Sequence, residues 1–409
     1  MIGGVILLRR IVEKLKPLAQ NVAVAVYTLI NKRDDSVVII GAWMGEKFSD
    51  NSRFLYQYLY KNKSLQKLKR VIWVTRSEKV NELLNSLGYE SYLIGTRESQ
   101  YWHLRGGIHI LCNTAFPQAR AKTDIDTRFS WGAKKIQLWH GVGMKSVGAA
   151  SNEAKKKTIS KFHASRLASW CTLGGWNEEY FLSTSKRNAE VNFAISLCKK
   201  DHLFISAYPR NCDCLELMPE ESEIISKISK FKKCIGYFPT FRTDNSNYVH
   251  PLEYPYIKNY ILNNDILWVE KPHSAESRPA VYSLGKNTLY LDKNFDLNVL
   301  FPYFDVVISD YSSVVFDCAY KNIPVVMYCP DLETFKNGDV GFLFDIESYC
   351  QGLIVKDEED LANHIIKGVS EEYMTDIVKD TYRRIIRDFF ENRESEYSQI
   401  WKDILEAIK

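Results

Sequence analysis

Short runs of β-branched and other apolar residues recur along the whole chain, and helical or loop-like stretches separate them. A strand that is followed by a helical crossover returns parallel to the strand before it. The alternation therefore predicts an α/β fold, with parallel sheets that are covered on both faces. The runs predicted to be strands are 37–43, 71–76, 91–96, 108–113, 136–140, 169–174, 203–208, 234–239, 266–271, 288–291, 306–309 and 324–328.

The chain has 409 residues, which exceeds the size at which a single hydrophobic core stops growing, so we expect two domains. A polar, charged stretch, 219–233, opens the second series of strands and places the boundary near residue 210. We predict Rossmann-like domains over 31–209 and 210–380, followed by C-terminal helices over 381–409 that can pack back on the first domain. Ligands of open α/β sheets bind beyond the carboxyl ends of strands, so residues directly after each strand are the candidates for function.

Residues 1–30 are predicted to form an amphipathic N-terminal segment that associates with a membrane. Basic residues occupy the opposite face from an apolar stripe at helical spacing, as in an interfacial helix on anionic lipid. A helix packed on the protein's own core fits the pattern equally well. The run 22–30 is too short to span a bilayer. The stripe consists of Leu8, Ile11, Val12 and Leu15.

The net charge and the cysteine spacing argue against a nucleic-acid-binding protein and against a zinc or redox protein. A formal net charge of +4 is too small for nucleic acid to be the main partner. The nine cysteines lack the paired spacing of a zinc or redox motif, and only Cys212 and Cys214 stand close together. We therefore expect reduced thiols in a cytoplasmic protein.

The first candidate loop is 139–145, Trp-His-Gly-Val-Gly-Met-Lys, at the end of a predicted strand. Gly141 and Gly143 allow tight turning and close approach of the backbone to a ligand. His140 is a residue type that serves as general base near neutral pH, and Lys145 lies where it can reach a phosphate. A structural histidine before an ordinary turn is the alternative interpretation.

Two further predicted strands end in side chains that suit phosphate. Thr240 and Arg242 follow one strand in Gly-Tyr-Phe-Pro-Thr-Phe-Arg, and the planar guanidinium of Arg242 offers paired donors. Lys271 and His273 follow the next strand in Glu-Lys-Pro-His-Ser, where they would suit an anionic leaving group. Solvated surface loops are the alternative interpretation for both segments.

The strand 306–309 runs into Asp310-Tyr-Ser-Ser, which places Ser312 and Ser313 at the start of a helical stretch. Backbone N–H groups, hydroxyls and the helix dipole bind phosphate oxygens at such a position, although simple N-capping explains the same residues. Arg210, in Tyr-Pro-Arg-Asn, is either a cleft residue or part of a plain linker. The strand ends thus share donors for a diphosphate.

Standard nucleotide and metal motifs are missing from the sequence. Met144 and Ser146 stand where a P-loop and the dinucleotide-binding fingerprint require glycine. No cysteine and histidine spacing suits a metal, and no carboxylate pair of a typical glycoside hydrolase accompanies the loops. Asp124 and Asp126 are close together, and we expect them in a solvated loop.

Four of these segments, in this order, resemble the motifs of the CDP-glycerol glycerophosphotransferase family, which comprises teichoic-acid primases and polymerases and related capsule polymerases. The resemblance covers residues 130–350, and residues 1–120 carry no matching motif. The motifs are Trp-His-Gly-x-x-x-Lys at 139–145, Tyr-Pro-Arg-Asn at 208–211, Tyr-x-Pro-Thr-Phe-Arg at 237–242 and Asp-Tyr-Ser-Ser-x-x-Phe-Asp at 310–317.

The resemblance implies a glycosyltransferase-B-like fold, in which two Rossmann-like domains face a cleft. It assigns the acceptor, a polymer or lipid-linked primer, to the first domain and the donor, CDP-glycerol or CDP-ribitol, to the second. It implies peripheral attachment to the cytoplasmic face of the cell membrane, and it firmly implies no cofactor or metal.

Carried over residue by residue, the resemblance makes His140 the general base and His273 a contact of the leaving group or phosphate. The residues expected around the donor diphosphate are Thr240, Arg242, Lys271, Asp310, Ser312 and Ser313, and Gly141, Lys145 and Arg210 are expected elsewhere in the cleft.

Two departures from the family pattern leave alternatives open. Pro272 precedes His273 where the family commonly has His-Pro, which leaves the role of His273 open. Asn337 precedes Gly338 where an arginine is frequent, which leaves the donor open between glycerol, ribitol and another polyol. A nucleotide-sugar glycosyltransferase or epimerase on the same fold is a competing interpretation. A non-catalytic component of a polymer assembly complex is another.

Overall fold

The computed structural model describes residues 19–20, 22–113, 123–150, 179–196, 198–240, 248–272, 282–338, 340–391 and 396–409. The chain divides into two compact units. The first unit comprises residues 1–140, 148–215 and 392–409, and the second comprises 141–147 and 216–391. Four predicted features lie outside the described residues: the stripe within 1–18, the strand 169–174, Arg242 and His273.

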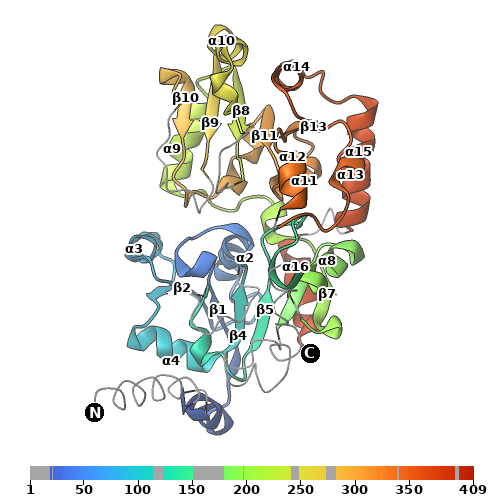
Figure 1. Cartoon of the computed structure of the whole chain (residues 1–409). Coiled ribbons are helices and arrows are strands. Elements are labelled where there is room, and N and C mark those ends of the chain that lie inside the picture. The colour runs from blue at the N-terminus through green and yellow to red at the C-terminus, as the bar shows by residue number, and fades with distance from the viewer. Residues whose placement is uncertain are drawn as a thin grey trace, which may run out of the picture. The chain divides into compact units, whose positions relative to one another are not determined.

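The first unit is built on a seven-stranded sheet in the order β3-β2-β1-β4-β5-β6-β7 (Figure 1). All neighbouring strands are parallel. The last four residues of β1 are buried, as expected for an apolar strand with cover on both faces. The strands are β1 (Asp34–Ile40), β2 (Arg70–Thr75), β3 (Ser91–Leu93), β4 (Gly106–Leu111), β5 (Lys134–Gln137), β6 (Tyr180–Ser183) and β7 (Leu203–Ile205).

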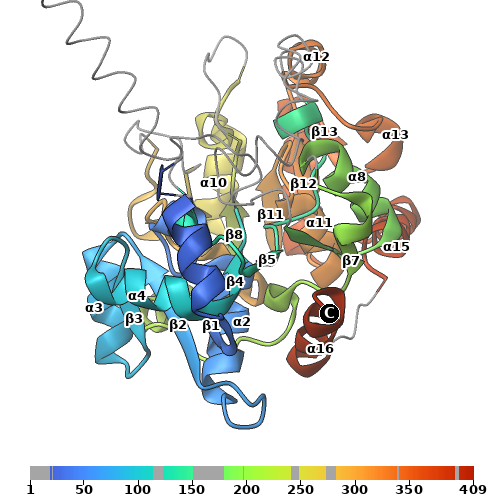
Figure 2. The same cartoon turned by 90° about the horizontal axis from the view of Figure 1, so that it is seen from below.

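Helices cover this sheet from segments distant in the sequence. Figure 2 shows α3 and α4 beside β3, and α8 and α16 at the other edge beside β7. Within the tail expected to pack back, α16 contacts β7, and the Ser206 hydroxyl donates to Asp403 at 2.6 Å. The helices are α2 (Asp50–Lys61), α3 (Glu78–Ser86), α4 (Arg97–Arg105), α8 (Lys186–Ser196) and α16 (Tyr397–Ala407), and residues 22–30 are also helical.

The second unit has a six-stranded sheet in the order β10-β9-β8-β11-β12-β13, and its neighbouring strands are again parallel. The predicted α/β class with parallel sheets is therefore confirmed. The order changes direction between β8 and β11, which is the point of an open α/β sheet where ligands bind. The strands are β8 (Lys233–Tyr237), β9 (Ile266–Glu270), β10 (Thr288–Tyr290), β11 (Val306–Ser309), β12 (Val325–Tyr328) and β13 (Ile354–Val355).

Amphipathic helices close the second unit. In α15 the Thr375 side chain accepts the N–H of Val378 as an N-cap, and Val378, Tyr382, Ile385 and Phe389 are buried along one face. This face packs on α11, whose Val315 and Phe316 are fully buried. The helices are α9 (Pro219–Ile228), α10 (Pro255–Asn263), α11 (Val314–Lys321), α12 (Leu332–Asn337), α13 (Ile346–Tyr349), α14 (Glu358–Val369) and α15 (Asp376–Phe389).

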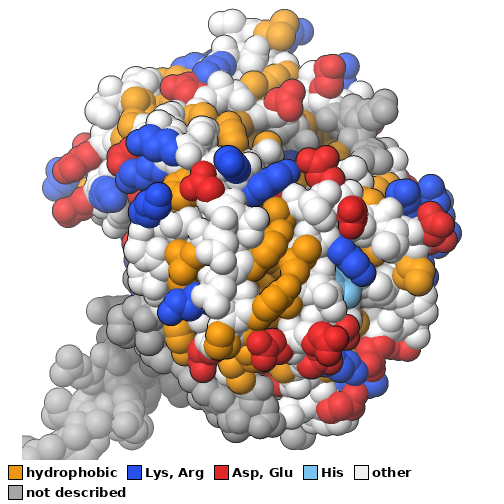
Figure 3. All heavy atoms as spheres, turned by 90° about the horizontal axis from the view of Figure 1, so that it is seen from above, with side chains coloured by type: hydrophobic (Ala, Val, Ile, Leu, Met, Phe, Trp, Pro, Cys, Tyr) orange, Lys and Arg blue, Asp and Glu red, His pale blue; other side chains and the backbone are white. Residues whose placement is uncertain are grey.

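Three observations concern the surface and the thiols. In the described part of the chain, no helix has the length and apolarity that a membrane crossing requires. Figure 3 shows acidic, basic and apolar side chains interspersed over the face in view, as expected for a small net charge. The eight cysteines within the described ranges form no disulfide with one another, and six of them are buried.

Candidate active site

His140 lies at the carboxyl end of the first sheet, three residues after β5. Its Nδ1 is 2.9 Å from the carbonyl oxygen of Cys112, which directly follows the neighbouring strand β4. Its ring packs against Trp139, with ring centroids 4.0 Å apart, and against Trp43, with centroids 5.3 Å apart. Two indole rings, after β1 and β5, and one backbone carbonyl, after β4, therefore hold the imidazole in one orientation.

This contact fixes which nitrogen of His140 carries the proton. A carbonyl oxygen only accepts hydrogen bonds, so Nδ1 must be the donor and Nε2 must hold the free lone pair. Within the described part of the first unit, no group forms a hydrogen bond to Nε2. An imidazole with an anchored Nδ1–H and a basic Nε2 is chemically suited to accept a proton from a hydroxyl.

A buried ion pair supports the loop that carries His140. Arg210 Nη1 lies 3.0 Å from Asp50 Oδ1 and 2.8 Å from the backbone oxygen of His140. The two charged side chains are 4% and 5% exposed. Asn51 completes the support, because its amide donates to the Trp139 oxygen at 2.8 Å and its Oδ1 accepts the Arg210 N–H at 3.2 Å.

The same loops hold several residues in a strained backbone conformation. Trp43, Met44, Asp50 and Trp139 have positive φ angles of 46°, 59°, 62° and 59°. Side chains other than glycine rarely occupy this region, and such residues persist where surrounding structure imposes the conformation. Strain of this kind gathers at functional sites, which makes the His140 region the strongest candidate in the first unit.

The electrostatic surroundings of His140 favour its neutral form. Burial lowers the pKa of the imidazole below its ordinary value, and the nearby Arg210 guanidinium acts in the same direction. Asp50 and the hydrogen bond to Cys112 oppose this shift of the pKa. The balance leaves a neutral, proton-accepting ring near pH 7.

In the second unit, the ends of β8 and β11 meet at the switch point of the sheet. The backbone N–H of Thr240, after β8, donates to both carboxylate oxygens of Asp310, after β11, at 2.9 and 3.0 Å. Just before these two residues, the Ser309 hydroxyl donates to the Phe238 oxygen at 2.7 Å. These bonds join the two strand ends into one rigid edge.

Lys145 belongs to this second edge rather than to the first unit. Residues 144–146 pair with 341–343 in antiparallel fashion, and the Lys145 Nζ lies 3.3 Å from the Thr240 hydroxyl. Phe335 stacks on Tyr311 at 4.1 Å, and its ring centroid lies 5.9 Å from the Lys145 Nζ. The predicted loop 139–145 is thus divided, with His140 in one unit and Lys145 in the other.

Ser312 and Ser313 lie at the start of α11, as the sequence predicts. Ser313 is the N-cap residue, but its hydroxyl makes no capping bond, and both serines are partly exposed. The N–H groups of Val314 and Val315 donate to the hydroxyl and the backbone oxygen of Ser312, so the two serine hydroxyls are the groups at this helix start that can face an anion.

The remaining predicted residues have distinct positions. Lys271 follows β9, beside β8, and its N–H donates to the Tyr237 oxygen at 3.2 Å. Gly141 has a φ of 147°, a value that glycine tolerates best. Asp310 and Arg210 are buried, and both bind other protein groups.

The expectation for Asp124 and Asp126 is wrong, because both are buried. Asp124 accepts the N–H groups of Met44, Cys112 and Asn113 at 2.7–2.8 Å and so joins the loops after β1 and β4. The Asp126 carboxylate instead accepts two hydrogen bonds from the Arg128 guanidinium, at 2.8 and 2.6 Å. Among the described residues, no group of three histidine, cysteine or acidic side chains is placed to hold a metal ion.

Sequence reasoning named Arg210 but missed Asp50 and Asn51, which support His140 together with it. Asp50 and Arg210 are 160 residues apart, and Asn51 and Trp139 are 88 residues apart, so no local pattern joins them. The one available signal was the position of Asp50 soon after a strand, at the start of an amphipathic helix.

Comparison with known proteins agrees with the fold. The solved structure of the wall teichoic acid polymerase TagF superposes with a TM-score of 0.68 at 18% identity, over 98% of this chain and 97% of that one. The two parallel-sheet units therefore define a glycosyltransferase-B-like fold.

The sequence defines the family. Residues 23–400 match the family described as CDP-glycerol:poly(glycerophosphate) glycerophosphotransferase, and the chain belongs to this family. The chain is 26% identical to the teichoic acid poly(glycerol phosphate) polymerase of Bacillus spizizenii, over 88% of this chain and 90% of the relative. It is 23% identical to the teichoic acid glycerol-phosphate transferase of Staphylococcus aureus, over 88% and 92%.

Proposed function

We propose that this protein transfers glycerol phosphate from CDP-glycerol to a hydroxyl group of a teichoic-acid or capsule polymer, or of its lipid-linked primer, and releases CMP. The observation that carries this proposal is the family match over residues 23–400, which includes both candidate edges. The geometry supports the chemistry, because one unit presents a basic imidazole and the other presents donors suited to a diphosphate.

In the first unit, His140 is the general base. Its Nδ1–H is anchored on the Cys112 carbonyl, so the Nε2 lone pair accepts the proton of the acceptor hydroxyl. Arg210 is a positioning residue, since it binds the backbone oxygen of His140 and is itself held by Asp50. This revises the role of Arg210 from cleft lining to support.

In the second unit, Lys145, Thr240, Ser312 and Ser313 bind the donor diphosphate. Ammonium and hydroxyl groups donate to phosphate oxygens, and the positive end of the helix dipole favours an anion beside the two serines. Asp310 is also a positioning residue, because a carboxylate that accepts two bonds from the Thr240 N–H cannot donate to a phosphate. Lys271 adds a cation beside β8, and Arg242 and His273 keep the diphosphate and leaving-group roles that the family resemblance implies.

The transfer is a displacement at phosphorus. The acceptor oxygen forms a bond to the phosphorus that carries glycerol, and its proton passes to His140 Nε2. The bond from that phosphorus to the bridging oxygen breaks, and the electron pair leaves on the phosphate of CMP. Positioning and charge stabilisation supply most of the catalysis in such a step.

We further propose that the protein works at the cytoplasmic face of the cell membrane. The helix of residues 22–30 exposes apolar side chains, including Leu29 and Ile30 at 82% and 76% exposure. Exposed leucine and isoleucine on a short helix suit an interfacial position. A lipid-linked acceptor would be presented at the same surface.

Release of CMP tests the function. The purified protein is incubated with CDP-glycerol, CDP-ribitol or a UDP-sugar, with and without a poly(glycerol phosphate) oligomer. We expect CMP from CDP-glycerol, and only with the acceptor. Turnover of the UDP-sugar alone would contradict the proposal and identify the protein as a glycosyltransferase. Binding of CDP-glycerol without turnover would favour a non-catalytic component of an assembly complex.

A further inference from the structure

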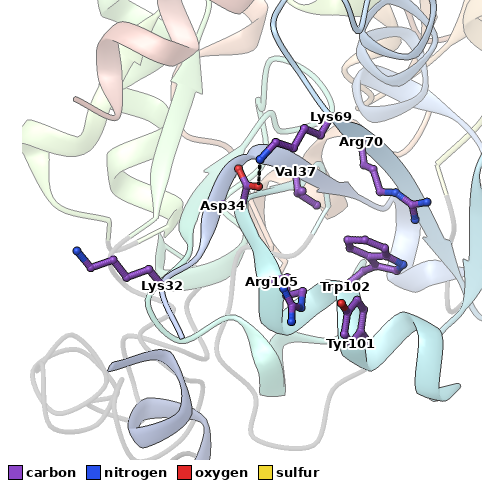
Figure 4. Close-up of a pocket in the computed structure, with 8 residues that line it drawn as sticks. All are labelled: Lys32, Asp34, Val37, Lys69, Arg70, Tyr101, Trp102 and Arg105. Carbon is purple, nitrogen blue, oxygen red and sulfur yellow. Dashed lines mark hydrogen bonds and ion pairs between the residues drawn. The ribbon is translucent and has the colours of Figure 1, made fainter. Parts of the chain in front are cut away.

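A second candidate binding site lies in the first unit, far from His140 along the strands. A pocket of about 280 Å³ opens where β1 and β2 begin and where α4 ends, whereas His140 lies where the strands end (Figure 4). Its volume is at the lower limit of small-molecule sites, which suits a compact polar group better than a whole nucleotide.

The lining of this pocket is strongly cationic. Lys32, Lys69, Arg70 and Arg105 line it, together with one carboxylate, Asp34. In the view of Figure 4 the Lys32 side chain extends away from the other labelled side chains, toward the surroundings of the pocket. Asp34 is neutralised by Lys69, whose Nζ is 2.8 Å away. Lys32 and Arg105 form no ion pair with any described residue, so two positive charges remain for a ligand.

Aromatic rings hold two of the cations in place. The Arg70 guanidinium lies 4.1 Å from the ring centroid of Trp102, and the Arg105 guanidinium lies 4.6 Å from that of Tyr101. Stacking of this kind occupies the face of a guanidinium and leaves N–H groups at its edge for an anion. Arg70 also binds Glu90 at 2.8 Å, so Arg105 is the freer donor.

An exposed apolar helix leads directly into this pocket. Residues 22–30 are helical, and Val22, Val26, Leu29 and Ile30 are 41%, 50%, 82% and 76% exposed. Ile30 precedes the pocket residue Lys32 by two positions. Figures 1 and 2 show this dark blue helix at the end of the first unit where β1 begins. An apolar surface beside a cationic one matches the boundary between acyl chains and anionic headgroups.

We propose that the pocket binds the headgroup phosphate of an anionic membrane lipid while the apolar side chains of residues 22–30 enter the lipid interface. Lys32 and Arg105 provide the charge, and the ring-stacked Arg70 provides further donors. This assigns a specific lipid contact to the membrane association proposed above, and it rests on that part of the proposed function.

Vesicle flotation tests the proposal. The full chain is mixed with phosphatidylcholine vesicles that contain or lack phosphatidylglycerol, and we expect binding to rise with phosphatidylglycerol. The variant Lys32→Gln/Arg105→Gln should bind the anionic vesicles about 30-fold more weakly, since each cation near such a surface contributes about fivefold. The charge-preserving variant Lys32→Arg/Arg105→Lys should retain binding.

The matched control is Lys79→Gln/Arg97→Gln. These cations are exposed, and Arg97 begins the same helix α4 that Arg105 ends, at the opposite end of the sheet. An equal loss of binding in this control would show that general surface charge, and not the pocket, attracts the vesicles, and it would overturn the proposal. Equal binding of wild-type protein to neutral vesicles would overturn it as well.

Soluble probes identify the ligand. Dihexanoyl phosphatidylglycerol should bind the full chain more tightly than inorganic phosphate, and the Lys32→Gln/Arg105→Gln variant should lose the difference. Equal affinity for inorganic phosphate would refute a lipid headgroup as the ligand. CMP release with a water-soluble acceptor is measured in parallel, so a failed transferase and a failed lipid site give different results.

Discussion

Breaking the Asp50–Arg210 ion pair tests how the first unit holds His140. Both side chains are almost fully buried, and Arg210→Met removes the cation paired with Asp50. Loss of one partner from a buried pair costs about 3–5 kcal/mol, which corresponds to a fall in melting temperature on the order of 10 °C. The control Glu190→Gln removes a pair with Arg187 that is 71% and 51% exposed, and should cost at most ~0.5 kcal/mol.

The same substitutions shift the pH dependence of turnover in opposite directions. A general base works when neutral, so the acid side of the kcat/KM profile reports the pKa of His140. Arg210 lowers and Asp50 raises this pKa. Arg210→Met should therefore move the acid limb to higher pH, and Asp50→Asn should move it to lower pH.

Urea unfolding of the full chain and pH–rate profiles check these two effects. The double variant Asp50→Asn/Arg210→Met should recover part of the stability, because no buried charge is left without its partner. A cost for Arg210→Met no larger than that of Glu190→Gln would refute the structural argument. Shifts of both acid limbs in the same direction would refute the electrostatic one.

Three further predictions concern other groups. Lys145→Met should weaken CDP-glycerol binding roughly 10–100-fold by calorimetry, because a charged hydrogen bond to phosphate is lost; unchanged affinity would remove Lys145 from the donor site. Asp310→Asn should destabilise the second unit by about 1–3 kcal/mol in urea, because its paired acceptance of the Thr240 N–H is lost. Burial lowers the pKa of His109 well below its ordinary value, so the folded state keeps the ring neutral while the unfolded chain takes up a proton, and stability falls progressively as the pH drops below about 6.5. Thermal midpoints of His109→Gln should depend less on pH, and an unchanged dependence would contradict this assignment.

The sequence predicts the strands best where they are apolar and bounded by turns. The strand 306–309 is observed with these bounds, and 266–271 ends one residue early at Glu270. The strand expected over 37–43 ends at Ile40, because Trp43 and Met44 turn the chain with positive φ angles. Sequence periodicity cannot show such a turn.

Two strands escaped prediction for physical reasons. β6 has only four residues and lies between the buried polar residues Glu179 and Thr184, which mask its apolar pattern. β13 has only two residues, too few for any alternation to register. Their places in the sheets come from pairing with β5, β7 and β12, which is tertiary information.

Some residues of the candidate site could be predicted from local sequence, and others could not. Residues at strand ends, such as His140, Thr240 and Ser312, could be found from local sequence, because function gathers beyond the carboxyl ends of strands. The assignment of Lys145 to the second unit could not be predicted from local sequence, because it depends on pairing with residues 341–343. The buried carboxylate of Asp124 also depends on contacts with distant loops.

The role of His140 in forming a phosphodiester can be measured by phosphorus NMR. CDP-glycerol and a poly(glycerol phosphate) oligomer are followed with wild-type protein and with His140→Ala. We predict new phosphodiester and CMP in equal amounts for the wild type, and a rate ~10²–10⁴-fold lower for His140→Ala with CDP-glycerol affinity retained. Phosphodiester formation at the wild-type rate by His140→Ala, or CMP without a new phosphodiester, would contradict the account.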